Sequence, residues 1–134
     1  MLEHQCNDSI CLVASISGSI ANKGLVSPVY NSSKAAVIQL VKNRAIESNP
    51  VRQDGSGGIR IDCLSPRHIL MPMVAQNPKD EPDLKDSWCR ENIVGRLADI
   101  ETSKVKSAAR YLLSKASSFM TGKNLVVDGD HTVW

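Results

Sequence analysis

Three short apolar segments, separated by stretches with helical periodicity, constrain the fold of this chain more than any other feature. They span residues 10–14 (ICLVA), 59–64 (IRIDCL) and 125–127 (LVV). The first is apolar throughout, which is typical of a strand buried on both faces of a parallel sheet. Because parallel strands are joined by long crossovers that are usually helical, we expect helices between these segments.

The stretch between the first two strands predicts one long helix, over residues 30–47. Ser27 is a suitable N-cap, Pro28 suits the first helical position, and Asn49-Pro50 ends the helix. The serine- and glycine-rich residues 15–28 before it predict a long loop. The residues expected on a wide apolar face of the helix are Ala35, Val37, Ile38, Leu40, Val41, Ala45 and Ile46.

Two further helices are predicted before the last strand. A short one is expected around residues 82–92, after a mostly irregular segment. The next begins after a cap at Asp99 or Thr102 and reaches Leu113. Its expected inward-facing residues are Val105, Ala108, Ala109, Leu112 and Leu113. The alternation of strands and helices predicts an α/β fold with a parallel sheet. Three strands are few for such a sheet, so residues 1–134 are expected to form one partial domain of a larger fold.

Composition and charge argue against several classes of function. The net charge is +2, and no Lys/Arg run or basic patch with interleaved aromatics indicates nucleic-acid binding. The first ten residues are polar, and no apolar stretch approaches membrane-spanning length. The four cysteines lack C-x-x-C spacing and have no histidine at ligand spacing, which favours reduced thiols over disulfides or a metal site. We therefore expect a soluble cytoplasmic protein without metal.

The first predicted helix carries a candidate catalytic pair of residues. Tyr30 and Lys34 are four residues apart and so share one helix face. An ammonium near a phenol favours its ionised form, which suits proton exchange near neutral pH. Ser15 and Ser17 follow the first strand, where parallel α/β sheets bind ligands. On periodicity alone, such a Tyr–Lys pair is more often an ordinary surface pair.

Three blocks of sequence together favour a catalytic role for this pair over an ordinary surface pair. They are residues 10–37 (ICLVASISGSIANKGLVSPVYNSSKAAV), residues 59–73 (IRIDCLSPRHILMPM) and residues 95–134, which contain T-G-K-N-L-V-V-D-G-D. In order and spacing they resemble the C-terminal half of the short-chain dehydrogenase/reductase family, with its strand, serine, loop and Y-x-x-x-K, its Pro-Gly turn and its T-G-x-x-x-x-V-D-G-G strand end. The style is similar to fungal mannitol and arabinitol dehydrogenases and sorbose reductases. The resemblance implies a partial Rossmann-type, doubly wound fold with about three parallel strands and flanking helices.

The resemblance also implies roles for individual residues. Tyr30 would be the general acid/base, and Lys34 would support it and hydrogen-bond the nicotinamide ribose. Ser15 would polarise the substrate carbonyl, with Ser17 as the alternative, and we expect the Tyr30 hydroxyl within hydrogen-bond reach of one of them. The residues that would contact the cofactor are Tyr30, Lys34, Pro66, Arg67 and Ile69.

The implied activity is interconversion of a carbonyl compound and a polyol with NADP(H) or NAD(H). The implied partners are a small-molecule carbonyl or polyol substrate and either a second copy of the chain or a full-length homologue. The family's T-G-x-x-x-G-x-G phosphate loop and N-N-A-G segment do not occur in these residues. We therefore expect the N-terminal dinucleotide-binding half to be lacking and independent activity to be small. The alternative is a non-catalytic fragment, or an interaction module that pairs with a homologue.

Two departures from the family pattern fall near the predicted site. The Pro-Gly pair is Pro66-Arg67 here, and the closing Gly-Gly is Gly129-Asp130. Glycine serves where backbone must approach closely or take a positive φ, so each change puts the local geometry in question. For Arg67 and His68 a solvated loop is the favoured interpretation over contact with a cofactor phosphate, and His4, His68 and His131 are expected to be exposed.

Overall fold

The computed structural model describes residues 8–22, 26–48, 58–70, 82–99 and 104–133. Several predictions from the sequence lie outside these ranges. They concern Cys6, His4, the Thr102 cap, the Asn49-Pro50 helix end and most of the irregular segment that follows residue 70.

The centre of the molecule is a parallel sheet of three strands. The strands are β1 (Ser9–Val13), β2 (Arg60–Pro66) and β5 (Asn124–Val127), in the order β1-β2-β5. Ile10 pairs with Ile61, and Leu64 pairs with Leu125, both in parallel register. The predicted strands and their parallel pairing are therefore confirmed, and β1 forms one edge of the sheet.

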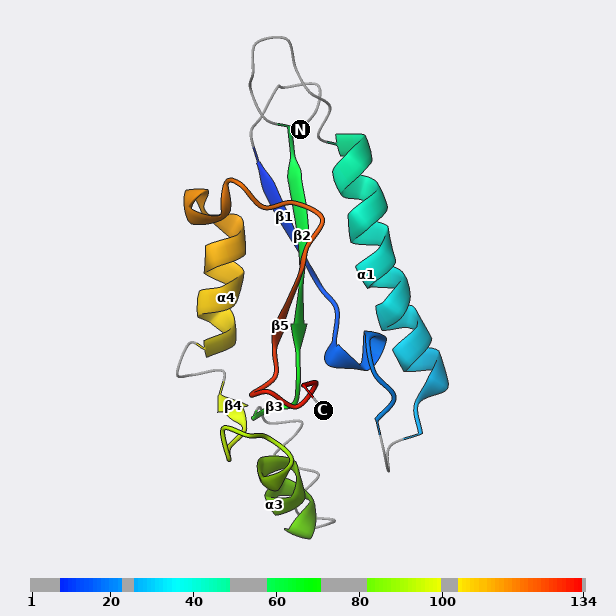
Figure 1. Ribbon diagram of the computed structural model, residues 1–134, viewed down its shortest axis with the longest axis vertical. Helices are drawn as coiled ribbons and strands as arrows, with labels where there is room; N and C mark the ends of the chain where they lie inside the picture. The colour runs from blue at the N-terminus through cyan, green and yellow to red at the C-terminus, as the bar shows by residue number, and fades with distance from the viewer. Residues whose placement is uncertain (1–7, 23–25, 49–57, 71–81, 100–103, 134) are drawn as a thin grey trace.

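Helices cover both faces of this sheet, with α1 (Pro28–Ser48) on one side and α4 (Lys104–Leu113) on the other (Figure 1). Strand side chains alternate between the faces. The core under α1 is formed by Ala14, Val41, Ile59, Ile61 and Cys63, with Ile10, Leu12, Val37 and Ile38 packed against it. This three-layer arrangement is that of a partial Rossmann-type fold, as predicted.

Helix α1 begins where the sequence predicts. Pro28 is its first residue, and the Asn31 N–H donates to the Ser27 carbonyl at 2.9 Å, which makes Ser27 the capping position. The expectation of a wide apolar face is only partly correct. Val41 and Ala45 are buried, but Leu40 is 46% and Ile46 80% exposed, because a straight helix turns only one stripe toward a sheet.

The second half of the chain holds elements that the sequence did not predict. A separate two-stranded parallel sheet joins β3 (Ile69–Leu70) to β4 (Ala98–Asp99). The helix between them in sequence, α3 (Pro82–Arg90), confirms the short helix predicted around residues 82–92. Asp99 therefore belongs to a strand and does not cap α4. Leu113 is 53% exposed and Leu112 is fully buried, so the prediction that Leu113 faces inward is wrong.

Two short 3-10 helices complete the fold: η2 (Ile16–Gly18) directly after β1, and η3 (Lys115–Ser117) after α4. Among the residues that the structure describes, none belongs to a helix long and apolar enough to cross a membrane.

Candidate active site

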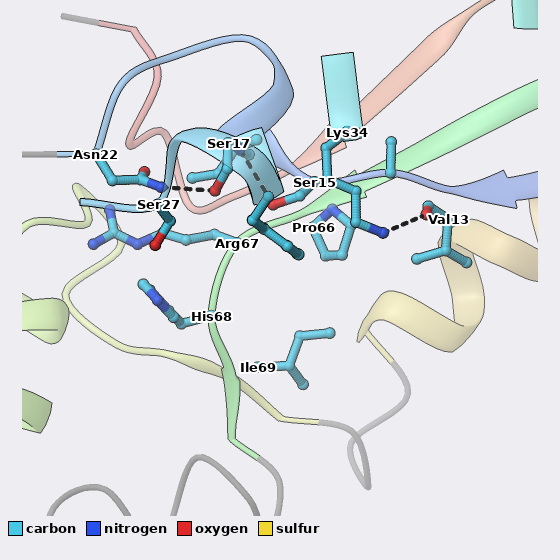
Figure 2. Close-up of a pocket in the computed structure, with 13 residues that line it drawn as sticks. Val13, Ser15, Ser17, Asn22, Ser27, Lys34, Pro66, Arg67, His68 and Ile69 are labelled. Carbon is cyan, nitrogen blue, oxygen red and sulfur yellow. Dashed lines mark hydrogen bonds between the residues drawn. The ribbon is translucent and has the colours of Figure 1, made fainter. Parts of the chain in front are cut away.

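A pocket with a volume of about 390 Å³ lies at the carboxyl ends of β1 and β2, beside the first turns of α1 (Figure 2). This is the edge of a parallel sheet at which α/β proteins bind ligands. All six site residues predicted from the sequence line it. The lining residues are Val13, Ala14, Ser15, Ile16, Ser17, Asn22, Ser27, Tyr30, Lys34, Pro66, Arg67, His68 and Ile69.

Of the two candidate serines, Ser15 directly precedes the short helix η2 and Ser17 lies within it, and each is 8% exposed. Ser15 caps η2, because its Oγ accepts a hydrogen bond from the Ser17 N–H at 3.2 Å. The Ser17 Oγ accepts a hydrogen bond from the Asn22 side-chain amide at 2.7 Å. Both hydroxyls are thus held by a donor, and each keeps its own proton to donate (Figure 2).

The packing of η2 on α1 depends on Gly18. A Cβ atom at this position would lie 2.6 Å from the Lys34 carbonyl carbon and 2.7 Å from the Ala35 nitrogen. These are backbone atoms of α1, which cannot move aside as a side chain can. Glycine therefore lets the serine-bearing segment rest directly on the turn of α1 that carries Lys34.

Tyr30 and Lys34 stand on the first turns of α1. The Lys34 ammonium donates to the Val13 carbonyl at 3.1 Å and lies 5.6 Å from the centroid of the Tyr30 ring. Tyr30 is 49% exposed, so it does not pack into the core. Among the described residues, no hydrogen bond joins its hydroxyl to Ser15 or Ser17, so the expected direct contact is not made, although all three residues line the same pocket.

The turn after β2 differs from the sequence-based expectation. Arg67 is 7% exposed, and its Nη2 donates to the Glu91 carboxylate at 2.5 Å, so the interpretation as a solvated loop residue is wrong. The reason is that α3 and the turn after it lie against the end of β2. Positive φ is not required at Arg67, because Asp130 is the only non-glycine residue with positive φ among the described residues. The arginine therefore fits this backbone without strain.

His68 is also more enclosed than predicted. Its ring stacks on Trp88 of α3, with centroids 4.2 Å apart and planes 8° from parallel. Burial, and then the nearby charge of Arg67, lowers the pKa of His68. His131 is half-buried with Nδ1 3.2 Å from the Glu91 carbonyl, so the expectation of exposed histidines is wrong for both.

The sequence did not single out Asn22 or Glu91 as neighbours of the site. Neither lies in a recognisable motif, and each reaches its position through tertiary packing. Trp88 is half-buried, and its ring stacks on His68.

The described thiols are free and lie away from the pocket lining. Burial raises the pKa of Cys63 to about 11, and the neighbouring Cys11 and Asp62 act in the same direction. A thiol that stays protonated is a poor nucleophile, so Cys63 is a core residue of the sheet and not a reactive group.

The sheet is of the Rossmann type, and a tyrosine, a lysine and the two candidate serines line the pocket at its carboxyl edge. A family model described as Enoyl-(Acyl carrier protein) reductase matches residues 1–132. The chain belongs to the short-chain dehydrogenase/reductase family, as the resemblance of its motifs implied.

Curated relatives support a fungal, polyol-dehydrogenase-like character. The chain is 37% identical over its whole length to a short-chain dehydrogenase/reductase, notP', of Aspergillus versicolor, and covers 44% of that protein. It is 35% identical, again over its whole length, to the D-arabinitol 2-dehydrogenase (ribulose-forming) of Scheffersomyces stipitis, and covers 46% of it. The chain thus spans about half the length of the curated relatives that it matches.

Solved structures agree with the fold. The structure of ElxO with NADP bound superposes on the whole of this chain with a TM-score of 0.81 and 26% sequence identity, and half of that protein is covered. The three-stranded sheet and its flanking helices therefore correspond to part of a complete fold of this family.

Proposed function

We propose that the pocket carries out the proton transfer of an NAD(P)(H)-dependent interconversion between a carbonyl compound and a polyol. The observation that carries this proposal is the gathering of Ser15, Tyr30 and Lys34 around one cavity at the carboxyl edge of the sheet. The names of the relatives, among them a D-arabinitol 2-dehydrogenase, support a sugar alcohol and its ketose as the pair. Free thiols are consistent with a cytoplasmic location.

Each of these residues has a distinct part in the proposed chemistry. The Tyr30 hydroxyl gives a proton to the substrate oxygen during reduction and takes it back during oxidation. The Lys34 ammonium, 5.6 Å from the Tyr30 ring centroid, stabilises the phenolate that remains. The Ser15 hydroxyl donates a hydrogen bond to the carbonyl oxygen, where negative charge develops. Ser17 can replace Ser15 in this role only if its bond to Asn22 allows it the same reach.

The pocket lining fits the nicotinamide end of a dinucleotide. Val13, Ile16, Pro66 and Ile69 offer apolar surface for the ring, and Lys34 offers a donor for ribose hydroxyls. When bound, NAD(P)(H) supplies or accepts the hydride. We propose that Pro66, Arg67 and Ile69 form the wall against this end of the cofactor.

A chimera tests the proposal. The N-terminal half of the S. stipitis relative is joined to this chain, and oxidation of NADPH and of NADH is followed with D-ribulose. We expect turnover that depends on the ketose, and a loss of about 10²–10⁴-fold in kcat for Tyr30→Phe, the usual contribution of a general acid.

Tyr111 on α4 is the matched control, because it is the only other tyrosine of the sequence. Its hydroxyl donates a hydrogen bond to the Met120 sulfur. Tyr111→Phe should leave turnover within a factor of about two, since surface changes away from a site have small effects. A folded chimera whose turnover is the same with Tyr30→Phe would contradict the catalytic assignment.

The second candidate function is association with another chain. It is supported by β1, which is an edge strand of the β1-β2-β5 sheet, and by the exposed apolar residues Leu40 and Ile46 on α1. An unpaired strand edge is a template for further pairing. A chain that binds a full-length homologue, and whose chimera is inactive, would favour this role over catalysis.

A further inference from the structure

The strongest unexplained feature of the pocket is the Arg67 guanidinium. The side chain is 4% exposed, and among the described residues its Nη2 alone has a partner, the Glu91 carboxylate. The Nε and Nη1 atoms are buried and have no hydrogen-bond partner in the part of the chain that the structure describes. Figure 2 shows the side chain running from the end of β2 in the direction of Asn22 and Ser27, which line the same pocket.

Such an arrangement is costly unless a ligand completes it. A buried donor without a partner costs about 1–3 kcal/mol, and more when the group is charged. Buried charges in folded proteins are paired and hydrogen-bonded. Two open donor atoms on one buried guanidinium therefore indicate a ligand group with acceptor oxygens.

The charge of the pocket indicates the sign of that ligand. Of the described residues that line it, Lys34 and Arg67 are cationic and none is an aspartate or glutamate. Glu91 approaches Arg67 from outside the lining, and its side chain is 46% exposed, so solvent weakens its compensation of the buried charge. The lining is thus suited to an anion.

The size of the pocket limits the anion to a small molecule. A volume of about 390 Å³ is near the lower end of the range for small-molecule sites. Guanidinium groups bind carboxylates and phosphates well, because they are planar, always charged and weakly hydrated. A carboxylate on the molecule whose reacting oxygen meets Ser15 and Tyr30 would satisfy Arg67 within the same cavity.

We propose that Arg67 is a carboxylate-binding residue, and that the pocket binds a small hydroxy acid or the corresponding keto acid more tightly than a neutral polyol or ketose of the same length. This inference rests on the proposed function, since it names the substrate class for the same pocket. The chemistry at Tyr30 is unchanged. Arg67 orients an acidic substrate through its acid group and so favours it over a neutral sugar, which can still bind.

The test compares two probes that differ in one group. D-Gluconate and D-glucitol have the same six-carbon chain, and only the first carries a carboxylate. The 134-residue chain is titrated with each by ¹H–¹⁵N NMR, with the Arg67 Nε–H signal as the reporter. We expect gluconate to shift this signal with a Kd at least about 10-fold below that of glucitol, which corresponds to roughly 1.4 kcal/mol.

Variants distinguish binding of gluconate at Arg67 from nonspecific attraction to positive charge. Arg67→Gly, which restores the family residue, and Arg67→Lys should both reduce the preference for gluconate to less than about twofold, since lysine lacks the planar donors. Arg110→Lys, at an exposed position on α4, should keep the preference. Circular dichroism checks that each variant is folded. If a variant does not fold, the comparison of the two probes on the unaltered chain still tests the proposal.

Two results would overturn the inference. One is equal binding of gluconate and glucitol by the unaltered chain. The other is a shift with inorganic pyrophosphate but not with gluconate, which would assign Arg67 to a cofactor phosphate. Neither result bears on the chimera experiment, in which Tyr30-dependent reduction of a neutral ketose supports the proposed function independently. The two proposals can therefore fail separately.

Discussion

At the scale of single residues, the end of the last strand shows how the chain accommodates a departure from its family. Gly129 and Asp130 both have left-handed backbone, with φ of +67° and +66°. The family pattern has two glycines here, and the structure explains why: both positions need positive φ. Aspartate tolerates this region better than most residues, but it still carries a cost.

Asp130→Gly should therefore stabilise the fold. Removing the strain of a left-handed non-glycine residue adds roughly 1–2 kcal/mol to the free energy of unfolding. The greater conformational freedom of glycine in the unfolded chain subtracts about 0.4–1 kcal/mol from it. We expect a net gain of about 0.5–1 kcal/mol in the free energy of unfolding, measured by urea denaturation. Asp130→Val should lose at least that much, because a β-branched residue resists positive φ, and a neutral result for both would show that this turn is not strained.

Residue identities near the pocket were predictable where a motif fixed them. Tyr30, Lys34 and Ser15 follow from the family pattern, and all three line one pocket. The surroundings of Arg67 did not follow, because its burial depends on Glu91, which is 24 positions away in the sequence. No local pattern encodes such a tertiary contact.

At the scale of elements, the site depends on how η2 rests on α1. The strand β1 delivers Ser15, the short helix η2 carries Ser17, and α1 carries Tyr30 and Lys34. The Lys34 side chain also ties α1 to the end of β1 through the Val13 carbonyl. Gly18 is the position where η2 and α1 come closest, so it controls the relation between the serines and the Tyr–Lys pair.

Gly18→Ala should push the two elements apart. The new Cβ would lie within 2.8 Å of three α1 backbone atoms, and overpacking of this kind costs about 1–3 kcal/mol. We expect that loss in the free energy of unfolding, together with a fall in kcat of the chimera as Ser15 moves from its place. Ser19→Ala, at an exposed neighbouring position, should change stability by less than about 0.5 kcal/mol. Unchanged stability and activity in Gly18→Ala would mean that η2 shifts freely.

The main elements could be predicted from the sequence because the spacing of apolar residues reflects which faces are buried. A continuous apolar run predicted β1, the segment at residues 59–64 predicted β2, and the spacing of Val37, Val41 and Ala45 predicted α1. The pair β3 and β4 was missed, since two-residue strands carry no periodic signal. The exposed faces of α1 were not predicted, because apolar residues also occur on protein surfaces.

At the scale of the whole molecule, the sheet has an open side. Among the described strands β1 pairs with β2 alone, so within this part of the chain its other edge is open. The chain also spans about half of each relative, 44% and 46% for the two curated proteins named above. Both facts bear on what a protein made of these 134 residues can do by itself.

We expect that such a protein does not turn over a nicotinamide cofactor. Binding a dinucleotide requires a pyrophosphate site, which this fold class builds from backbone N–H groups of a glycine-rich loop at a helix N-terminus. The 134 residues contain no T-G-x-x-x-G-x-G sequence, and in the proposed function the described pocket contacts the nicotinamide end of the cofactor. Without most of the cofactor contacts, the orientation that hydride transfer needs is also lost.

Calorimetric titration with NADPH, and NADPH oxidation with a panel of ketoses and keto acids, measure this directly. We expect no binding tighter than about 1 mM, or roughly −4 kcal/mol, and no turnover above that of the Tyr30→Phe variant. Binding of a small acid at Arg67 should persist in the same preparation, because that subsite lies within the described pocket. Micromolar NADPH binding with Tyr30-dependent turnover would instead mean that the C-terminal half provides a phosphate site of its own, built from residues outside the known pattern.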